Sequence, residues 1–392
     1  MEKYNTNIKI AIKDICIKNI DSIKVDQIGL IDYIDIASVD NKYKTIYNFK
    51  TIDIKDAPSR AKQIIKKNDI LVSTVRPNLN AVAINNLISS NIQVCSTGFC
   101  VLRPKEYVLP SYLFNFCKSD LFINEISRQA TGASYPAVNS RIIKNCQIPL
   151  PSLGEQKRIA AIMDKATELI ALRKQQLEKL DLLVKSRFIE MFGDPVENPF
   201  GWPTRPLLNM GYCKNGMNFH TGDSGIEIHC LGVGDFKDYS IIDGTDHLPK
   251  ISLKETPPEE SMLKDGDILF VRSNGNKALV GRSLVVYPRN TPTTYSGFCI
   301  RYRLTSGEVN RAYLLRVLKT DSMRTKMAGR GANIQNLNQQ ILATLDIPTP
   351  PIDLQEQFST FVTQSDKSKS TLQQSLEKLE LNYKALMQTY FG

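Results

Sequence analysis

The sequence lacks the features that would indicate a membrane span, a metal site or a redox centre. No apolar run approaches the ~18 residues that a membrane-spanning helix requires. The eight cysteines are scattered, and no two of them have the two-residue gap of a zinc knuckle or a redox motif. His229 and Cys230 are adjacent, but neighbouring side chains do not easily reach one metal ion. We therefore expect no metal and free, buried thiols.

Catalytic motifs are equally scarce. The sequence has no Gly-x4-Gly-Lys-Ser/Thr phosphate loop, so ATP-driven work is not expected of it. It has three histidines, and none is spaced to suggest a Ser-His-Asp or Cys-His arrangement. Leu231–Asp235 contains a lone Gly-x-Gly without a surrounding βαβ pattern, which we interpret as a turn at the end of a strand. The sequence therefore offers no catalytic residue and no site for a cofactor.

The composition is that of a globular protein with a basic surplus. The chain is 42% hydrophobic and 23% charged, and 50 basic against 40 acidic residues give a net charge of +10. A surplus of this size suits a polyanionic partner such as nucleic acid, although many basic proteins bind none. The polar first seven residues lack the layout of a signal peptide, so we expect a cytoplasmic protein.

The most informative feature present is an internal repeat of long period. Five short segments recur in the same order, and their first copies are Asp69-Ile70-Leu71, Gly98-Phe99-Cys100, Ile148-Pro149, Leu177-Glu178-Lys179-Leu180 and Phe192-Gly193. Four recur 199 residues downstream (392 − 193 = 199), and the first recurs as Asp267-Ile268-Leu269, 198 residues downstream. Ordered matches at one offset are hard to obtain by chance, so the chain is two copies of one unit. Such a duplication predicts a pseudo-two-fold molecule.

Each copy ends in a segment that predicts a long helix. Residues 155–192 and 355–391 contain no glycine or proline, and each segment follows a proline-rich stop. Their apolar residues recur at steps of three and four, which is typical of a helix with one apolar face. These residues are Ile159, Ile162, Ala166, Leu169, Leu177, Leu180, Leu183, Phe188 and Met191, then Leu372, Leu376, Leu379, Tyr383, Leu386 and Tyr390.

A long helix with one apolar stripe needs a partner, and two arrangements are open. Two chains could form a homodimeric coiled coil, or the two helices of one chain could pair with each other. We favour pairing within the chain, because each chain already carries two long helices with an apolar stripe. Duplication about a two-fold axis makes that pairing antiparallel.

The remainder of each copy mixes short β-rich runs with one helical stretch. The runs lie at 8–12, 29–36, 70–75, 81–84 and 98–102, then at 227–231, 267–271, 284–287 and 298–304. The helical stretches cover 110–129 and 310–328, and 195–206 is a linker by its prolines. We predict an α+β fold class, with two duplicated α/β-mixed domains separated by two long antiparallel coiled-coil helices. The predicted segments are 1–149 (first mixed domain), 150–194 (first helix), 195–348 (linker and second mixed domain) and 349–392 (second helix).

One loop in each copy, here called the strand loop, carries side chains suited to DNA bases. Arginine can form paired hydrogen bonds with guanine, and asparagine or glutamine can do so with adenine. The same Arg-x-Asn-x-Asn spacing follows both Asp-Ile-Leu runs. The candidate residues are Arg76, Asn78 and Asn80 in the first copy, and Arg272, Asn274, Asn276 and Lys277 in the second.

A second loop, here called the exit segment, precedes each long helix at 128–136 and 329–338. Its candidates are Arg128, Ser134 and Tyr135 in the first copy, and Arg330, Asn333 and Gln335 in the second. Glycines there let the backbone approach a phosphate, but Gly, Asn and Ser are equally ordinary in surface turns. Asn139 matches Asn338 at the offset of 199, which indicates a shared framework role, because domains that read different sequences should differ where they read. Basic residues such as Arg301 and Arg303 could add phosphate contacts, although most of these are expected to be solvated.

Segments around the two long helices carry a family resemblance. They are the Ile-Pro-x-Pro run before Glu155-Gln156, the helix exit Phe188–Pro195, and Ile347–Pro351 before Glu356-Gln357. Asp267–Leu269 and Gly331–Asn333 are similar to segments of target-recognition domains. Together they resemble the specificity (S) subunit of type I restriction–modification systems. The resemblance covers essentially the whole chain, and although each motif is short, their ordered duplication is specific to this architecture.

The resemblance implies that this chain recognises the DNA and that other subunits modify or cut it. Each of two target-recognition domains would read one half of a bipartite site on double-stranded DNA. The helices would set the spacer and dock two methyltransferase (M) subunits, which bind S-adenosylmethionine and methylate adenine, and restriction (R) subunits would be further partners. The chain itself would be non-catalytic: Asn198-Pro199-Phe200 lacks the second proline of the methyltransferase loop, so we interpret it as a turn. The helix residues expected at partner contacts are Glu155, Gln156, Leu180, Phe188, Glu356, Gln357, Leu379 and Leu386.

Two other functions remain open at this point. A stand-alone DNA-binding protein with two half-site readers would bind its site without a methyltransferase. A structural coiled-coil adaptor would explain the helices but not the paired Arg-x-Asn-x-Asn loops. The DNA sequence recognised cannot be predicted, because side-chain-to-base pairings depend on loop geometry.

Overall fold

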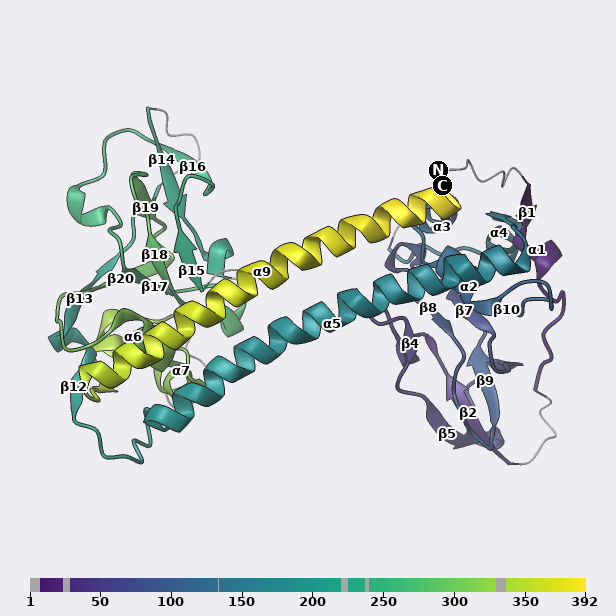
Figure 1. Cartoon of the computed structure of the whole chain (residues 1–392), viewed down its shortest axis with the longest axis horizontal. Coiled ribbons are helices and arrows are strands. Elements are labelled where there is room, and N and C mark those ends of the chain that lie inside the picture. The colour runs from purple at the N-terminus through teal and green to yellow at the C-terminus, as the bar shows by residue number, and fades with distance from the viewer. Residues whose placement is uncertain (1–7, 24–28, 133, 220–224, 237–239, 329–335) are drawn as a thin grey trace. The chain divides into compact units, whose positions relative to one another are not determined.

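The computed structural model describes residues 8–23, 29–132, 134–219, 225–236, 240–328 and 336–392 (Figure 1). The chain divides into two compact units. Unit 1 comprises Met1–Gln175 and Gln373–Gly392, and unit 2 comprises Gln176–Leu372. Two helices of 40 residues each, α5 (Leu153–Phe192) and α9 (Ile352–Phe391), contribute one part to unit 1 and the other part to unit 2.

Unit 1 is built on two small sheets and short helices. The first sheet has the order β5-β2-β9-β6 (Lys50–Asp53, Leu30–Ile34, Ile92–Ser96 and Ala61–Ile64). The second has the order β10-β7-β8 (Phe99–Leu102, Ile70–Ser73 and Val82–Ile84). Two further pairs are β1 with β11 (Lys9–Ala11 and Gln147–Pro149) and β3 with β4 (Val39–Asp40 and Thr45–Ile46). The helices are α1 (Ile12–Ile15), α2 (Pro110–Cys117), α3 (Asp120–Arg128) and α4 (Ser140–Asn145).

Unit 2 repeats this plan with different numbers of strands in its sheets. Its larger sheet has the order β13-β20-β17-β18-β15 (Gly211–Asn215, Cys299–Leu304, Asp267–Val271, Ser283–Tyr287 and Ile241–Asp243). Its smaller sheet has the order β16-β14-β19 (Lys250–Leu253, Ile226–Leu231 and Thr293–Tyr295), and β12 pairs with β21 (Thr204–Pro206 and Asp346–Pro348). The helices are α6 (Arg311–Leu318), α7 (Asp321–Ala328) and α8 (Gln339–Ala343).

The strand pairings confirm the duplication that the sequence predicts. In unit 1, β2 pairs antiparallel with β5 and parallel with β9, and in unit 2, β14 pairs antiparallel with β16 and parallel with β19. The central strands β7 and β17 are buried at every residue, as continuous apolar runs predict. Each is paired on both sides, β7 by β10 and β8, and β17 by β20 and β18.

In unit 1 the long helices complete the core of the mixed domain. Met163 of α5 and Phe391 of α9 are fully buried with Tyr112 and Phe116 of α2. The Phe391 ring lies 5.4 Å from the Tyr112 ring and 5.8 Å from the Phe116 ring, centroid to centroid. Burying an aromatic ring removes a large apolar area from water, so these contacts fix the helix ends on the domain.

Unit 2 has an equivalent aromatic cluster. Phe188 and Phe192 of α5 pack against Phe358 of α9, with centroid distances of 5.5 and 5.6 Å. Tyr313 of α6 stacks edge-on against Phe192 at 4.7 Å. In both units, therefore, the two long helices of one chain pack on each other.

The helices run antiparallel within each unit. In unit 1, Lys174 of α5 forms an ion pair with Glu380 of α9 at 2.8 Å, and Arg158 lies over the ring of Tyr390 at 5.8 Å. Residue numbers thus rise along α5 as they fall along α9, which agrees with the predicted direction of the pair. None of the helices among the described residues is long and apolar enough to cross a membrane.

The helical stretches 110–129 and 310–328 each hold two helices, because Ser119 accepts a hydrogen bond from the Phe122 amide at 3.3 Å and Thr320 from the Met323 amide at 3.4 Å. Two sequence-based expectations need correction. The linker 195–206 ends in a strand, β12.

The second correction concerns part of the apolar stripe of α5. Ile159 and Phe188 are buried as predicted, but Leu169 and Leu183 are 37% and 50% exposed. Met163 and Val184, which the predicted stripe did not include, are buried. A straight helix drifts by about 20° per heptad from a strict seven-residue repeat, so a stripe read at fixed steps leaves the contact face.

Candidate nucleic-acid interface

The strand loops begin after buried strands that are anchored at their other end by an ion pair. In unit 1, Arg103 donates from Nε and Nη2 to the Asp69 carboxylate at 2.8 and 2.7 Å. In unit 2, Arg303 does the same to Asp267 at 2.7 and 2.7 Å. Both aspartates are 1% exposed. Paired hydrogen bonds between a guanidinium and a carboxylate fix the orientation of both groups, so they hold the strand that presents the loop.

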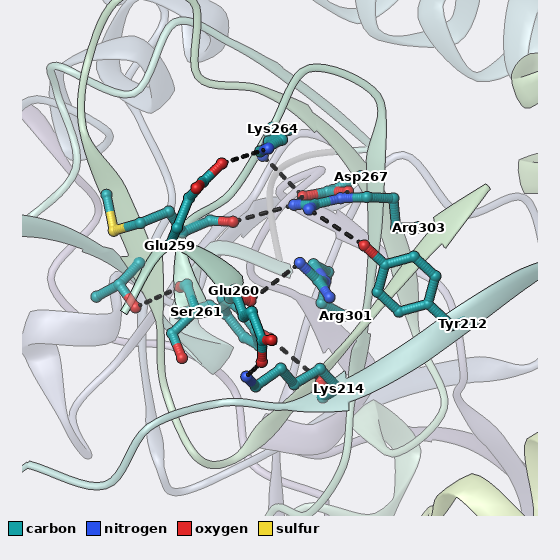
Figure 2. A network of polar contacts seen from close by, with 12 residues as sticks. Tyr212, Lys214, Glu259, Glu260, Ser261, Lys264, Asp267, Arg301 and Arg303 are labelled. Carbon is teal, nitrogen blue, oxygen red and sulfur yellow. Dashed lines mark hydrogen bonds and ion pairs between the residues drawn. The ribbon is translucent and has the colours of Figure 1, made fainter. Parts of the chain in front are cut away.

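Figure 2 shows the unit 2 anchor in its surroundings. Arg303 also donates to the Met262 carbonyl at 3.0 Å and to the Tyr212 hydroxyl at 3.4 Å. Its hydrogen bonds to Asp267 raise the pKa of the Arg303 guanidinium above its ordinary value. Because Arg303 is held by these partners, it is a structural residue rather than the solvated phosphate contact considered from sequence.

Arg301 is a second basic residue in Figure 2 that the sequence analysis placed on the surface. It is fully buried, lies over the Tyr212 ring at 5.2 Å and donates to the Glu260 carbonyl at 3.1 Å. In strand register Arg301 lies opposite Leu269, as Val101 lies opposite Leu71 in unit 1. Arg301 therefore joins β13 to the segment around Glu260.

The strand loop of unit 1 has an unusual backbone. Arg76 and Asn80 both have left-handed conformations, with φ of 48° and 47°, on either side of a short 3-10 turn at Pro77–Leu79. The Arg76 amide donates to the Pro136 carbonyl at 2.7 Å. The Asn80 side chain donates to the Lys118 carbonyl at 3.5 Å, so Asn80 supports the loop, whereas Asn78 is exposed. Left-handed non-glycine residues cost energy and persist where the surroundings hold them.

The structure brings the strand loop and the exit segment of unit 1 together. The Arg76 guanidinium lies 4.6 Å from the centroid of the Tyr135 ring. A bridge between Val75 and Ala137 joins the two backbones beside this contact. Arg76 is exposed and Tyr135 is 69% exposed, so both side chains face solvent. Ser134 and Arg128 are also exposed, and Arg128 lies in the last turn of α3.

Unit 2 joins its two loops in the same way. Ser273 forms a bridge with Asn336, and the Leu337 amide donates to the Arg272 carbonyl at 2.7 Å. Asn274 accepts from the Asn276 amide at 2.8 Å, and Asn276 accepts from the Ala278 amide at 3.1 Å. Their carbonyl oxygens therefore shape the strand loop itself. The candidates Arg330, Asn333 and Gln335 and the side chain of Lys277 lie outside the described residues.

The framework role expected of Asn139 and Asn338 is confirmed. Asn139 accepts from the Ile142 amide at 3.0 Å and begins α4. Asn338 accepts from the Ile341 amide at 2.8 Å and begins α8. Both are helix caps that follow an exit segment, which explains why the two copies share this residue.

Comparison with known proteins fits this duplicated geometry. The family described as the type I restriction modification DNA specificity domain matches residues 7–182 and 250–381, which is most of the chain in two copies. The chain belongs to this family. It is 28% identical over 316 residues to the type I restriction enzyme StySPI specificity subunit of Salmonella potsdam, covering 75% of this chain and 67% of that protein. It is 27% identical over 227 residues to the EcoKI specificity subunit of Escherichia coli strain K12, covering 54% and 48%.

Solved structures show that this member of the specificity family has the family's fold. A chain from a structural study of complex assembly and conformational transition of the type I R-M system is 24% identical, with a TM-score of 0.65, and the match covers 98% of this chain and 97% of that one. The type I restriction-modification S subunit from M. genitalium is 15% identical, with a TM-score of 0.58, and coverage of 100% and 98%. The predicted fold class is thereby confirmed.

Gln156, expected at a partner contact of this specificity protein, is a joint between the mixed domain and the helix. It is 1% exposed, accepts from the Leu109 amide at 2.8 Å, and donates to the carbonyls of Tyr107 and Pro151 at 3.1 and 3.0 Å. Gln355 makes the equivalent three bonds in unit 2. Because 355 − 156 = 199, its counterpart is Gln355 and not Gln357. The prediction that Gln156 faces a partner is therefore wrong.

The other predicted helix residues divide by exposure. Phe188 is buried in unit 2, Leu386 packs against the core of unit 1, and Leu180 and Leu379 are half-buried. The Arg158 guanidinium forms an ion pair with the Glu155 carboxylate at 2.6 Å. This contact holds the pKa of the Glu155 carboxyl below its usual value. Glu356 and Gln357 are exposed.

The long helices also expose apolar side chains that the stripe did not indicate. On α5, Leu172 in unit 1 is 45% exposed, and Leu182 and Ile189 in unit 2 are 59% and 46% exposed. These positions lie off the predicted stripe, so the signal for them is an apolar residue on the polar face of a helix.

The cysteines are free, and seven of the eight are buried. Burial raises the pKa of the Cys16 and Cys146 thiols to about 12, so they stay protonated at neutral pH. Within the described residues no group of His, Cys, Asp and Glu could hold a metal ion.

The Asn198 side chain bonds to both the amide and the carbonyl of Trp202, which confirms that Asn198-Pro199-Phe200 is a turn.

Proposed function

We propose that this chain is the sequence-reading subunit of a type I restriction–modification complex, in which each unit reads one half of a bipartite DNA site. The observation that carries the proposal is the equivalent joining of strand loop and exit segment in both units, by Val75–Ala137 in one and Ser273–Asn336 in the other. The framework is the same, and the sequences of the exit segments differ, with Ser134–Pro136 in one copy and Asn333–Gln335 in the other. Two readers of two different half-sites require that combination.

The exposed candidates in unit 1 divide between two roles. Arg76 and Asn78 are exposed in the strand loop and can reach base edges, where paired hydrogen bonds specify sequence. Arg128 and Ser134 are exposed in and after α3 and suit contacts to phosphates, which position the protein without specifying sequence. In unit 2, Arg272 of the strand loop takes the place of Arg76.

Methyl transfer to adenine belongs, in this proposal, to separate methyltransferase subunits that bring S-adenosylmethionine with them. Two such subunits fit a chain with two copies of one unit, and restriction subunits are further partners. The chain itself is non-catalytic. The exposed Leu182 and Ile189 of α5 lie seven residues apart and so share one face of the helix, which supports a docking role for that face. Glu356 and Gln357 at the start of α9 are polar candidates for the same contact.

The proposal is tested by co-expressing the chain with the methyltransferase encoded with it and mapping methylated adenines by single-molecule sequencing. We expect a stable complex and a bipartite motif with a fixed gap. If no methyltransferase co-purifies and no adenine is methylated, the chain is not a specificity subunit. Specific binding to DNA by the purified chain alone, with no complex, would favour a stand-alone DNA-binding protein.

A further inference from the structure

Arg76 is exposed to solvent and yet held in one place. Its backbone is left-handed, with φ of 48°, a conformation that is uncommon for a residue other than glycine. The amide bond to the Pro136 carbonyl, at 2.7 Å, ties this backbone to the exit segment. The guanidinium carbon lies 4.6 Å from the centroid of the Tyr135 ring. Backbone and side chain are therefore both fixed by residues of another loop.

The hydrogen-bond donors of this guanidinium are unused. Among the residues that the structure describes, no carboxylate lies within ion-pair distance of Arg76, and no acceptor takes its side-chain N–H groups. Contact of the guanidinium with an aromatic ring uses none of its N–H groups in a hydrogen bond to an acceptor atom. The N–H donors of Arg76 are thus available to an external acceptor.

An arginine of this kind suits one base in particular. Guanine presents N7 and O6 side by side in the major groove, and the two parallel donors of a guanidinium match them. The other bases do not offer two acceptors in this arrangement. A side chain already fixed by stacking loses less conformational freedom on binding than a free one.

We propose that Arg76, stacked on Tyr135, reads a guanine in the half-site bound by unit 1, donating to O6 and N7. This inference rests on the proposed function and adds a base identity to it. Tyr135 acts as a positioning residue, because contact with its ring holds the guanidinium beside the exit segment. The proposal concerns unit 1 alone, since the residues of unit 2 that correspond to Tyr135 lie outside the described chain.

The test uses the full chain in complex with its methyltransferase. Binding is measured by competition, with duplexes in which each base pair of the methylated motif is replaced in turn. For the wild type we expect one guanine position in the half-site of unit 1 at which every replacement weakens binding by roughly 5- to 150-fold. Arg76→Ala should abolish the preference at that position and retain it at all others. Arg76→Gln should also lose it, because glutamine pairs with adenine.

Variants of Tyr135 separate stacking from a general structural effect. Tyr135→Phe keeps the ring and should leave the guanine preference unchanged. Tyr135→Ala should reduce the guanine preference only in part. Arg76 would keep its charge but lose its contact with the ring. Arg60→Ala removes another exposed arginine of unit 1 and should leave the base preferences unchanged, which controls for the loss of one positive charge.

The possible failures are distinguishable. If the wild-type complex has no bipartite motif, the proposed function fails. If it has one, but the half-site of unit 1 contains no guanine or Arg76→Ala keeps every base preference, the function stands and the role of Arg76 is refuted. Equal thermal unfolding midpoints of Arg76→Ala and the wild type would confirm that the variant is folded.

Discussion

At the scale of single residues, the pairs Arg103–Asp69 and Arg303–Asp267 serve the same purpose in the two units. The sequence shows that Asp69 and Asp267 recur, but the recurrence alone suggested only a common strand. Their partners lie 34 and 36 residues further along the chain. No local pattern predicts contacts over such separations, so the function of these aspartates required the structure.

Replacing Arg103 by alanine should strongly destabilise unit 1. Asp69 is 1% exposed, and removing its partner leaves a buried charge without compensation, which typically costs about 3–5 kcal/mol. The free energy of unfolding in urea measures the loss. Arg187→Ala is the matched control, because Arg187 and its partner Glu190 are 43% and 67% exposed, and an exposed pair contributes about 0–1 kcal/mol. Equal losses for the two variants would contradict the anchoring role of Arg103.

The glutamines at the start of the long helices show a second limit of sequence analysis at this scale. Gln156 was singled out through the family resemblance, at the start of the long helix, but its role was assigned to a contact with a partner subunit. The Leu109 amide that it accepts from lies 47 residues earlier in the chain. A buried joint and an exposed docking residue look alike in sequence when their partners are distant.

At the scale of elements, the long helices were predicted to within a few residues and the strands less well. A helix has its period in its own sequence, whereas short strands such as β5, β6 and β13 take their stability from partners elsewhere in the sheet. The break between α2 and α3 was missed, because Ser119 looks like any helix residue until its side chain is seen to cap α3.

The end of α9 should matter greatly to the stability of unit 1. Phe391 is fully buried against Tyr112 and Phe116, so Phe391→Ala is expected to cost about 3–5 kcal/mol. Leu381→Ala, on the same helix, removes a side chain that is 68% exposed and should change stability by no more than about 0.5 kcal/mol. Thermal or urea unfolding distinguishes the two. A loss below about 1 kcal/mol for Phe391→Ala would show that α9 does not complete the core.

Equivalent lysines follow α2 and α6, and each makes stability depend on pH. Burial lowers the pKa of Lys118 to about 8, with nearby Asp164 opposing and Lys44 adding to the effect. Burial, together with Arg316, Lys369 and Arg282, lowers the pKa of Lys319 to about 8, and Asp181 opposes it. The folded state therefore binds fewer protons than the unfolded state between pH 8 and 10.5, the ordinary pKa of a lysine. The cost of the buried charge is full below pH 8 and is relieved as the pH rises through this window.

Lys118→Met should accordingly stabilise the protein at pH 7, and the gain should shrink between pH 8 and pH 10. The full shift, from 10.5 to about 8, sets an upper limit of about 3 kcal/mol. The quantity to measure is the difference in unfolding free energy between variant and wild type, since other titrating groups cancel in it. Lys157→Met, at an exposed position of α5, controls for the general effect of replacing a lysine by methionine. A pH-independent difference for Lys118→Met would contradict the account.

At the scale of the whole molecule, the duplication was the strongest prediction that the sequence allowed. An offset of 199 residues can be recognised without knowing any contact. The strand pairings and the arginine–aspartate pairs of both units agree with it. The individual base-reading residues were less accessible to prediction. Asn80, Asn274 and Asn276 have the right residue types, but their side chains take part in shaping the loops.

The central claim is that each unit reads its own half of the DNA site. The most direct test replaces residues 1–149 by the corresponding domain of a relative with a known motif and maps methylated adenines for the chimera in complex with methyltransferase. We predict that one half-site changes to that of the relative, while the other half-site and the gap stay as in the wild type. A motif that changes in both halves, or in neither, would contradict the account.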